Sequence, residues 1–330
     1  MEKFNVVIIC RLLTDGYPRL CLEQLLKHEG KRRHMSKAKQ LKAIVARRQA
    51  LPVPGAANAL SARVIEDLGF EVVYLTGAGL ANTTFGVPDI GLTTLTEVVS
   101  AASAISDAID LPIIVDADTG FGNPLNMVRT IRSLERAGAA GIQIEDQVFP
   151  KKCGHFSGKD VIPLSEMLDK LKAALDTRID PDLQIIARTD AAAVEGLDRA
   201  IERAQAFAEI GADLTFVEAP RSLDELAQIP GKIAVPQVAN IVFGGKTPDP
   251  GRSEMTKMGF SLVLYANAAL QASVRAQYEV LGALKQTGSL DAVAGQLATF
   301  EERQRVVSKD AWDALEQRYT LKDLKMGAAE

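Results

Sequence analysis

The chain has 330 residues, of which 47% are hydrophobic and 24% are charged, and its formal net charge is -4. This composition is ordinary for a globular protein, and the acidic balance argues against a nucleic-acid surface or a polybasic membrane anchor. No apolar run approaches the roughly 20 residues that a membrane-spanning helix needs. The three cysteines, Cys10, Cys21 and Cys153, follow no metal or disulfide spacing. We therefore expect a reduced, cytoplasmic protein without nucleic-acid or membrane partners.

Residues 1–34 do not join the periodicity that follows, and they end in the basic run KRRH before Met35. We interpret them as an N-terminal extension that need not be ordered. It either lies upstream of a true start at Met35 or serves as a targeting or docking segment. Residues 35–330 are predicted to form one barrel domain, with a helical tail from about residue 267.

From Lys37 onward, short apolar runs alternate with amphipathic stretches. Most of the runs are nearly continuously apolar, as expected of strands that are covered on both faces. The predicted strands are Leu51–Pro54, Glu71–Thr76, Pro112–Asp116, Gly141–Glu145, Leu183–Thr189, Asp213–Glu218, Lys232–Val238 and Ser261–Tyr265. The helices predicted between them include Ala59–Leu68, Leu95–Ala108, Leu125–Ala137, Leu164–Leu175 and Leu197–Ile210.

Eight such repeats predict an α/β fold, either a closed parallel barrel or a doubly wound sheet. No GxGxxG motif follows the first strand, and chemically active residues end most strands, which favours the (β/α)8 TIM barrel. The stretches 268–285, 291–296 and 309–318 then predict more helix than one barrel needs. We expect these extra helices to cover a neighbouring subunit, with packing on their own barrel as the alternative.

The run VDADTGFGNP at Val115–Pro124 carries two carboxylates at the end of a predicted strand. Alternation along a strand puts Asp116 and Asp118 on the same face, and Glu145 ends the next strand. Three acids at one rim, without thiolate or imidazole ligands nearby, suit a hard cation, most simply Mg²⁺. The alternative is a set of solvated turn and cap aspartates.

The loop KKCGH at Lys151–His155 places Cys153 between lysine and histidine side chains. Neighbouring positive charges lower a thiol pKa from its usual value of about 8.5. An acid/base role for Cys153 is therefore favoured over an inert buried cysteine. On the residues alone, a covalent nucleophile and a proton donor both remain open.

Single polar residues end several other strands. Thr76, Gly77 and Ala78 could offer backbone N–H groups to a carboxylate, and Arg188 is suited to bidentate carboxylate binding. Each of these residues could equally be a structural cap, but their gathering at one rim indicates a site. Asp89, Glu218 and Asn240 belong to the same set.

Four motifs in order, DADTGFG, IEDQVFPKKCGH, IIARTDA and ANIVFGGKTP, are similar to those of the isocitrate lyase/phosphoenolpyruvate mutase superfamily. The resemblance runs from about Leu41 to Gly288, and KKCGH resembles the signature of its lyase branch. It implies a Mg²⁺-dependent (β/α)8 barrel, with Mn²⁺ as a substitute. It also implies a homotetramer whose C-terminal helices are exchanged between subunits.

The resemblance also implies a role for each matching residue. Asp116 and Asp118 correspond to the metal acids, and Glu145 to a residue of the metal's water shell. Cys153 corresponds to the proton donor and Tyr74 lies near the substrate oxygen. We group Lys151 and His155 with these two as catalytic. The residues assigned to substrate binding are Thr76, Gly77, Ala78, Asp89, Gly154, Arg188, Glu218 and Asn240.

Three departures bear on the substrate. Members that cleave methylisocitrate carry arginines on the C-terminal helices where this chain has Gln271 and Phe300, and Phe243 replaces a common glutamate. A carboxylate that loses a charged hydrogen bond forfeits about 1.5–3 kcal/mol, so we expect a small malate-type dicarboxylate with alkyl substituents, such as 2,3-dimethylmalate. Its cleavage gives a 2-oxo acid such as pyruvate and a carboxylic acid. The alternatives are oxaloacetate hydrolysis or decarboxylation, methylisocitrate cleavage, phosphonomutase chemistry and a non-catalytic binding barrel.

Overall fold

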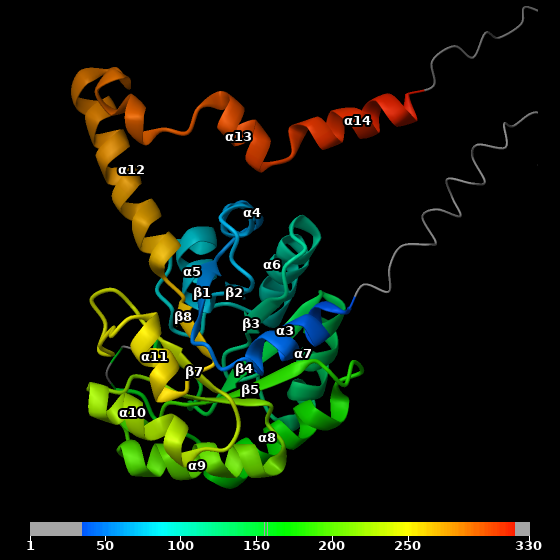
Figure 1. The fold of residues 1–330 in the computed structure, drawn as a ribbon, viewed down its shortest axis with the longest axis vertical. Coiled ribbons are helices and arrows are strands. Elements are labelled where there is room, and N and C mark those ends of the chain that lie inside the picture. Colours follow the sequence, from blue (N-terminus) through cyan, green and yellow to red (C-terminus); the bar gives the residue numbers. More distant parts are fainter. Residues whose placement is uncertain (1–34, 155, 157, 321–330) are drawn as a thin grey trace, which may run out of the picture. The chain divides into compact units, whose positions relative to one another are not determined.

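The computed structural model describes residues 35–154, 156 and 158–320. The expectations for residues 1–34 and for His155 lie outside the described residues. From Lys37 the chain forms one compact unit, in which eight parallel strands pair in sequence order and close into a barrel (Figure 1). The predicted (β/α)8 architecture is confirmed.

Seven of the eight predicted strands coincide with observed strands, but the prediction Lys232–Val238 is wrong in its bounds, because Lys232 ends α10 and the strand begins at Gln237. The first strand, which has two prolines, pairs with β8 through four residues and with β2 through two, and so closes the barrel. The strands are β1 (Leu51–Ala56), β2 (Val73–Leu75), β3 (Ile113–Asp116), β4 (Ala139–Glu145), β5 (Gln184–Thr189), β6 (Leu214–Val217), β7 (Gln237–Asn240) and β8 (Leu262–Tyr265).

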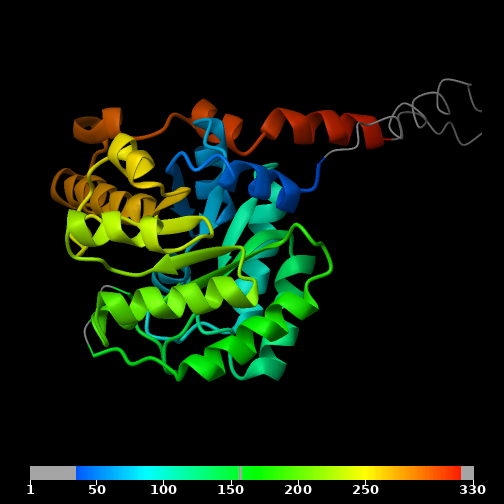
Figure 2. The ribbon, with the colours of Figure 1, turned by 60° about the horizontal axis from the view of Figure 1, so that its bottom comes forward.

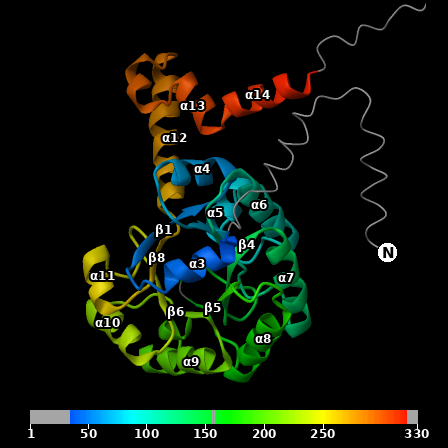
Figure 3. The ribbon, with the colours of Figure 1, turned by 45° about the vertical axis from the view of Figure 1, so that its right-hand side comes forward.

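Helices ring the strands on the outside (Figure 3). The sequence marks several of their ends: Asn123 caps α7 with Pro124 at its first position, and Gly211 ends α9 with φ of 112°. The helical segments up to β8 are α3 (Lys37–Val45), α4 (Ala59–Asp67), α5 (Gly77–Leu80), η1 (Ala81–Phe85), α6 (Leu95–Ala108), α7 (Pro124–Arg136), α8 (Leu164–Thr177), η2 (Ala191–Ala193), α9 (Leu197–Ile210), α10 (Leu223–Lys232) and α11 (Arg252–Met258).

The core has two layers. Inside the barrel, Val53, Ile114, Phe216 and Leu264 pack together, and α3 adds Leu41, which is fully buried. Between the strands and the outer helices, larger apolar clusters hold each helix to the sheet. Apolar side chains fill the interior and hold the strands in place. The polar residues at the carboxyl ends of the strands therefore have fixed positions relative to one another.

The C-terminal tail contains α12 (Ala268–Thr287), η3 (Asp291–Gln296), α13 (Phe300–Val306) and α14 (Lys309–Tyr319). It leads away from the strands (Figures 1 and 2), and none of the residues of α12 is buried. The helix α13 was not predicted; Arg305 ties it to α4 through two bonds to Asp67, of 2.7 and 2.8 Å. No described helix is long and apolar enough to cross a membrane.

Candidate active site

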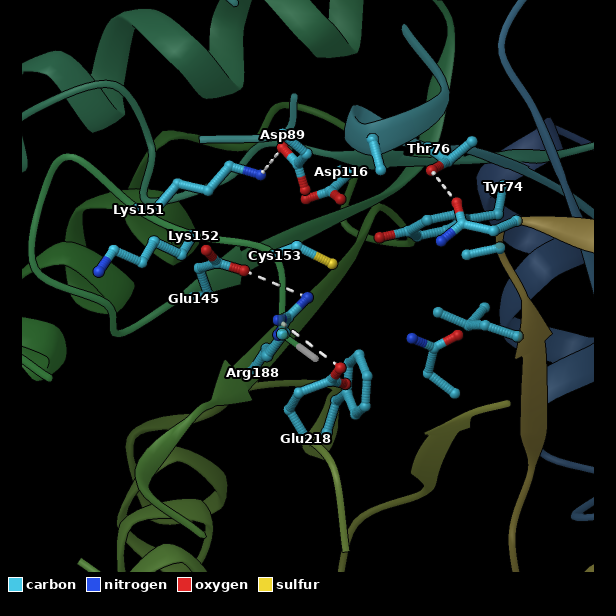
Figure 4. A pocket seen from close by; sticks show the side chains of 17 residues that line it. Tyr74, Thr76, Asp89, Asp116, Glu145, Lys151, Lys152, Cys153, Arg188 and Glu218 are labelled. Carbon is cyan, nitrogen blue, oxygen red and sulfur yellow. Dashed lines mark hydrogen bonds and ion pairs between the residues drawn. The ribbon is translucent and has the colours of Figure 1, made fainter. Parts of the chain in front are cut away.

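A pocket opens at the carboxyl ends of the strands (Figure 4). Its cavity volume is about 30 Å³. Twelve of the residues predicted from the sequence line it: Tyr74, Thr76, Ala78, Asp89, Asp116, Glu145, Lys151, Cys153, Gly154, Arg188, Glu218 and Asn240. Gly77 and Asp118 are not among the lining residues, although Asp118 lies 2.7 Å from the ammonium of Lys151, which does line the pocket. The residues added by the structure are Lys152, Phe216, Leu264, Ala266 and Asn267.

Asp116 and Asp118 converge, but not through strand alternation. Strand β3 ends at Asp116, and Asp118 lies in the following turn with a left-handed φ of 48°. Its backbone N–H donates to Asp116 Oδ1 at 3.2 Å. A Cβ placed on Gly77 would lie 3.3 Å from an oxygen of each aspartate. Both carboxylates therefore face one small region beside Gly77, where a Cβ would make a tight contact with each of them.

The expected cluster of three acids is not formed. Among the described residues, no three His, Cys, Asp or Glu side chains are grouped so as to hold a metal ion. Glu145 instead approaches Arg188, with 3.2 Å between Oε2 and Nη1. Burial raises the pKa of Glu145 well above its usual range. Burial also raises the pKa of Asp118 to about 7, against the pull of the Lys151 ammonium.

Arg188 is the fixed cation of the pocket. It is the second-last residue of β5, and its side chain is 8% exposed. Its guanidinium lies 5.3 Å from the ring centroid of Phe216. Its Nε donates to Asp190 at 2.9 Å, and Glu218 is 3.9 Å away. Burial lowers the pKa of Arg188, but the surrounding carboxylates more than offset this and raise it. The charge is therefore permanent and suited to holding a substrate carboxylate.

The loop that carries Cys153 is tied to the rim at several points. Lys151 pairs with Asp89 and lies 2.7 Å from Asp118 Oδ1, and the Cys153 N–H donates to the Asp89 carbonyl at 3.1 Å. Burial lowers the pKa of Lys151, but its acidic neighbours raise it well above the usual range. Lys151 is thus a charged anchor in this state. The Cys153 sulfur points into the pocket (Figure 4).

A glutamine missed in the sequence links two predicted site residues. The Tyr74 hydroxyl donates to Gln143 Oε1 at 3.1 Å, and Gln143 Nε2 donates to Asp116 at 3.3 Å. Burial raises the pKa of Tyr74 well above its usual value, so its hydroxyl stays neutral. The sequence does contain a signal for this residue, because Gln143 is a polar amide between the two isoleucines of GIQIE, a predicted buried strand.

The segment after β2 begins a short helix. Thr76 caps α5, and its hydroxyl accepts from the Gly79 N–H at 3.2 Å. The N–H groups of Gly77 and Ala78 are in the first turn, where α-helical backbones offer no internal partner. They remain suited to an anionic group, as the sequence predicts.

These features together define a class of protein: a (β/α)8-barrel enzyme whose polar pocket combines paired acids, a fixed arginine and a thiol. A family model described as phosphoenolpyruvate phosphomutase matches residues 41–285. The chain belongs to the phosphoenolpyruvate mutase/isocitrate lyase superfamily, and it is a carbon–carbon lyase of that group.

Two curated relatives are similar over most of their length. The chain is 42% identical over 268 residues to a 2,3-dimethylmalate lyase of Eubacterium barkeri, covering 81% of this chain and 93% of that protein. It is 41% identical over 258 residues to a 2-methylisocitrate lyase of Vibrio cholerae, covering 76% and 84%.

Solved structures agree with this placement. An oxaloacetate acetylhydrolase in complex with 3,3-difluorooxalacetate superposes with a TM-score of 0.82 at 33% identity, covering 86% of this chain and 97% of the other. A phosphonopyruvate hydrolase in complex with oxalate and Mg²⁺ superposes with a TM-score of 0.78 at 28% identity, covering 86% and 99%.

Proposed function

We propose that the protein cleaves a small alkyl-substituted malate, of the 2,3-dimethylmalate type, into a 2-oxo acid such as pyruvate and a carboxylic acid. One observation carries the proposal: Cys153 points into a pocket lined by Arg188 and by Asp116, one of the two paired aspartates. A proton donor, a place for a divalent cation and a carboxylate anchor are the three elements that retro-aldol cleavage of a 2-hydroxy acid requires. The similarity to 2,3-dimethylmalate lyase supports the choice of substrate.

Each residue has a physical task in this proposal. Arg188, with Asn240 and the first turn of α5, holds the carboxylate next to C2, while the neutral Tyr74 hydroxyl faces the C2 oxygen. When the C2–C3 bond breaks, its electron pair stays on C3 and spreads into the adjacent carboxylate. Cys153 donates its proton to C3 as a general acid. The proton lost from the C2 hydroxyl balances the one gained at C3.

The two aspartates fit Mg²⁺, which usually binds proteins through one or two carboxylates and keeps several waters. The fit rests on the oxygens of Asp116 and Asp118 that face one region beside Gly77. The related hydrolase with Mg²⁺ supports the choice of ion, and Mn²⁺ would substitute. Bound Mg²⁺ would polarise the C2 oxygen and lower the cost of negative charge on it.

The rim beside the pocket supports a small substrate without a third carboxylate. Gln271 on α12 donates through Nε2 to the Phe243 carbonyl at 3.1 Å, and the Phe243 side chain is 87% exposed. Both residues line a neighbouring cavity that contains no arginine or lysine. Phe300, the other position at which methylisocitrate-cleaving members carry an arginine, lies on α13 and is 69% exposed.

We further propose a homotetramer in which the C-terminal helices cover a neighbouring subunit. Support comes from α12, whose residues Val274, Tyr278 and Leu281 recur at helical spacing on one face and are 47%, 78% and 57% exposed. On α14, Trp312 is 64% exposed. Apolar side chains of this size on successive turns favour a protein partner over water.

The function is tested with a spectrophotometric pyruvate assay over 2,3-dimethylmalate, other 2-alkylmalates, methylisocitrate, oxaloacetate and phosphonopyruvate, each with Mg²⁺. We expect the highest kcat/KM with a dialkylmalate and loss of pyruvate formation with EDTA. Release of oxalate from oxaloacetate as the dominant reaction would assign hydrolysis instead, the activity named for a structural neighbour.

Gly154→Ala is expected to lower kcat about 100-fold while leaving the melting temperature within about 2 °C. A Cβ at this position would lie 2.1 Å from Glu218 Oε1 and 2.5 Å from Arg188 Nη2. The loop would have to move away, and displacing a catalytic group by about 1 Å costs on the order of 100-fold. Gly231→Ala is the matched control, because a Cβ there meets nothing within 4 Å. Wild-type turnover in Gly154→Ala would contradict this close packing.

A further inference from the structure

Lys159 makes a buried bridge behind the Cys153 loop. Its ammonium donates to the backbone carbonyl of Gly154 and to Asp190 Oδ1, the latter at 2.6 Å. The side chains of Lys159 and Asp190 are only 1% and 0% exposed. Lys159 does not line the active-site pocket, so any effect it has on the reaction must pass through the groups it binds.

Asp190 connects Lys159 to the carboxylate anchor. It accepts from Arg188 Nε at 2.9 Å and from Arg188 Nη2 at 3.1 Å. Its own N–H donates to Asp146 at 2.9 Å, and the Thr189 hydroxyl donates to the other Asp146 oxygen at 2.7 Å. Although burial raises the pKa of Asp190, the two cations lower it below the usual range. One ionised carboxylate thus holds Arg188 on one side and Lys159 on the other.

Gly154 is held from both directions. On the pocket side, its Cα is so close to Arg188 and Glu218 that a Cβ would overlap them. On the opposite side, its carbonyl accepts from Lys159. Lys159 is the direct link between the residue next to Cys153 and the residue that grips Arg188. Holding two catalytic groups at a fixed separation is a recognised source of rate enhancement.

We propose that Lys159 is a positioning residue that sets the Cys153–Gly154 backbone against Arg188, so that the thiol meets the carbon to be protonated while Arg188 holds the substrate carboxylate. The proposal rests on the proposed lyase reaction for its kinetic consequence. The substrate carboxylate still meets Arg188 when Lys159 is lost, because Asp190 keeps its two bonds to Arg188. The loss therefore affects kcat more than KM.

The test uses the full-length chain with Cys10→Ser and Cys21→Ser, so that Cys153 is the cysteine that thiol labelling reports on. In this background, Lys159→Met is compared with the protein that retains Lys159. We expect Lys159→Met to react with iodoacetamide at least about tenfold faster at Cys153, because loss of a charged hydrogen bond frees the loop. We expect kcat for pyruvate formation to fall at least about tenfold, with KM changed less than threefold. Lys159→Gln, which keeps a neutral donor, should lie between the two.

Lys37→Met is the matched control. Lys37 also donates to backbone carbonyls, those of Ser106 and Ile109 at 3.0 and 2.8 Å, but lies on α3 away from the pocket. It should change neither the labelling rate nor kcat. Wild-type labelling and kcat in Lys159→Met would overturn the proposal. If Lys159→Met does not fold, the same two readouts on Lys159→Gln decide. If the wild type forms no pyruvate, the proposed reaction fails, and the labelling rate alone judges the role of Lys159.

Discussion

Cys153→Ala is expected to abolish cleavage, with kcat lower by about 10²–10⁴-fold, the usual contribution of a positioned general acid. The carbanion at C3 would lose its proton source, whereas substrate binding by Arg188 and metal binding by the aspartates would persist. Mg²⁺ affinity, measured by calorimetry, should therefore match the wild type. Cys153→Ser should be nearly as inactive, because a hydroxyl is a far weaker acid than a thiol.

The control for this prediction is the Cys10→Ser/Cys21→Ser double variant, which removes the other two cysteines and should keep wild-type turnover. A Cys153→Ala enzyme with near-native kcat would rule out the proton-donor role. Loss of Mg²⁺ binding together with kcat would instead mean that the substitution had disturbed the whole site.

Asp116→Asn is expected to have the second large effect, a loss of Mg²⁺ affinity of more than about 100-fold. Loss of a partner that only orients a metal ligand costs about 10–100-fold, and Asp116 is proposed as a direct ligand. The amide keeps the shape of the side chain. Because the Asp116 charge raises the pKa of the buried Asp118, removing it relieves repulsion, and the melting temperature without metal should not fall.

Calorimetric titration with Mg²⁺ and thermal melting in EDTA measure these two effects separately. Asp182→Asn is a suitable control, since Asp182 is a partly exposed partner of Lys42 and does not line the pocket. Unchanged Mg²⁺ affinity in Asp116→Asn would remove this residue from the metal site and leave Asp118 to carry it with other groups.

The barrel could be predicted because its signal is local. Continuous apolar runs such as GIQIE mark strands that are buried on both faces, and the alternation with amphipathic stretches sets the fold class. The helices α5 and α13 were not predicted, for two different reasons. The first spans only four residues, Gly77–Leu80, and the second lies in a tail with no buried residue of its own to mark its face.

The site could be predicted as a set of residues but not as a set of contacts. Strand ends meet at one rim in any parallel barrel, so Asp116, Glu145 and Arg188 were expected to be close. Which acidic side chain pairs with which cation depends on the length and conformation of the side chains and on the backbone turns that follow the strands. The left-handed turn at Asp118 and the pairing of Glu145 with Arg188 are both of this kind.

Residues that act through others carry the weakest signal. In the sequence, Lys159 is indistinguishable from an ordinary loop lysine, and Asp190 from a capping residue after β5. Only their burial together reveals that they join the Cys153 loop to Arg188. The carbon skeleton of the substrate is equally hidden, since Phe243 and Gln271 come together from β7–α11 and α12.

The central claim is that the chain cleaves an alkyl-substituted malate between C2 and C3, forming a 2-oxo acid, and then protonates the departing carbon. Its most direct test is NMR of the products formed from 2,3-dimethylmalate and Mg²⁺ in D₂O. We predict equal amounts of pyruvate and propionate, with one deuterium in each propionate at the carbon next to the carboxylate. No cleavage of any alkylmalate, together with conversion of oxaloacetate to oxalate and acetate, would contradict the claim.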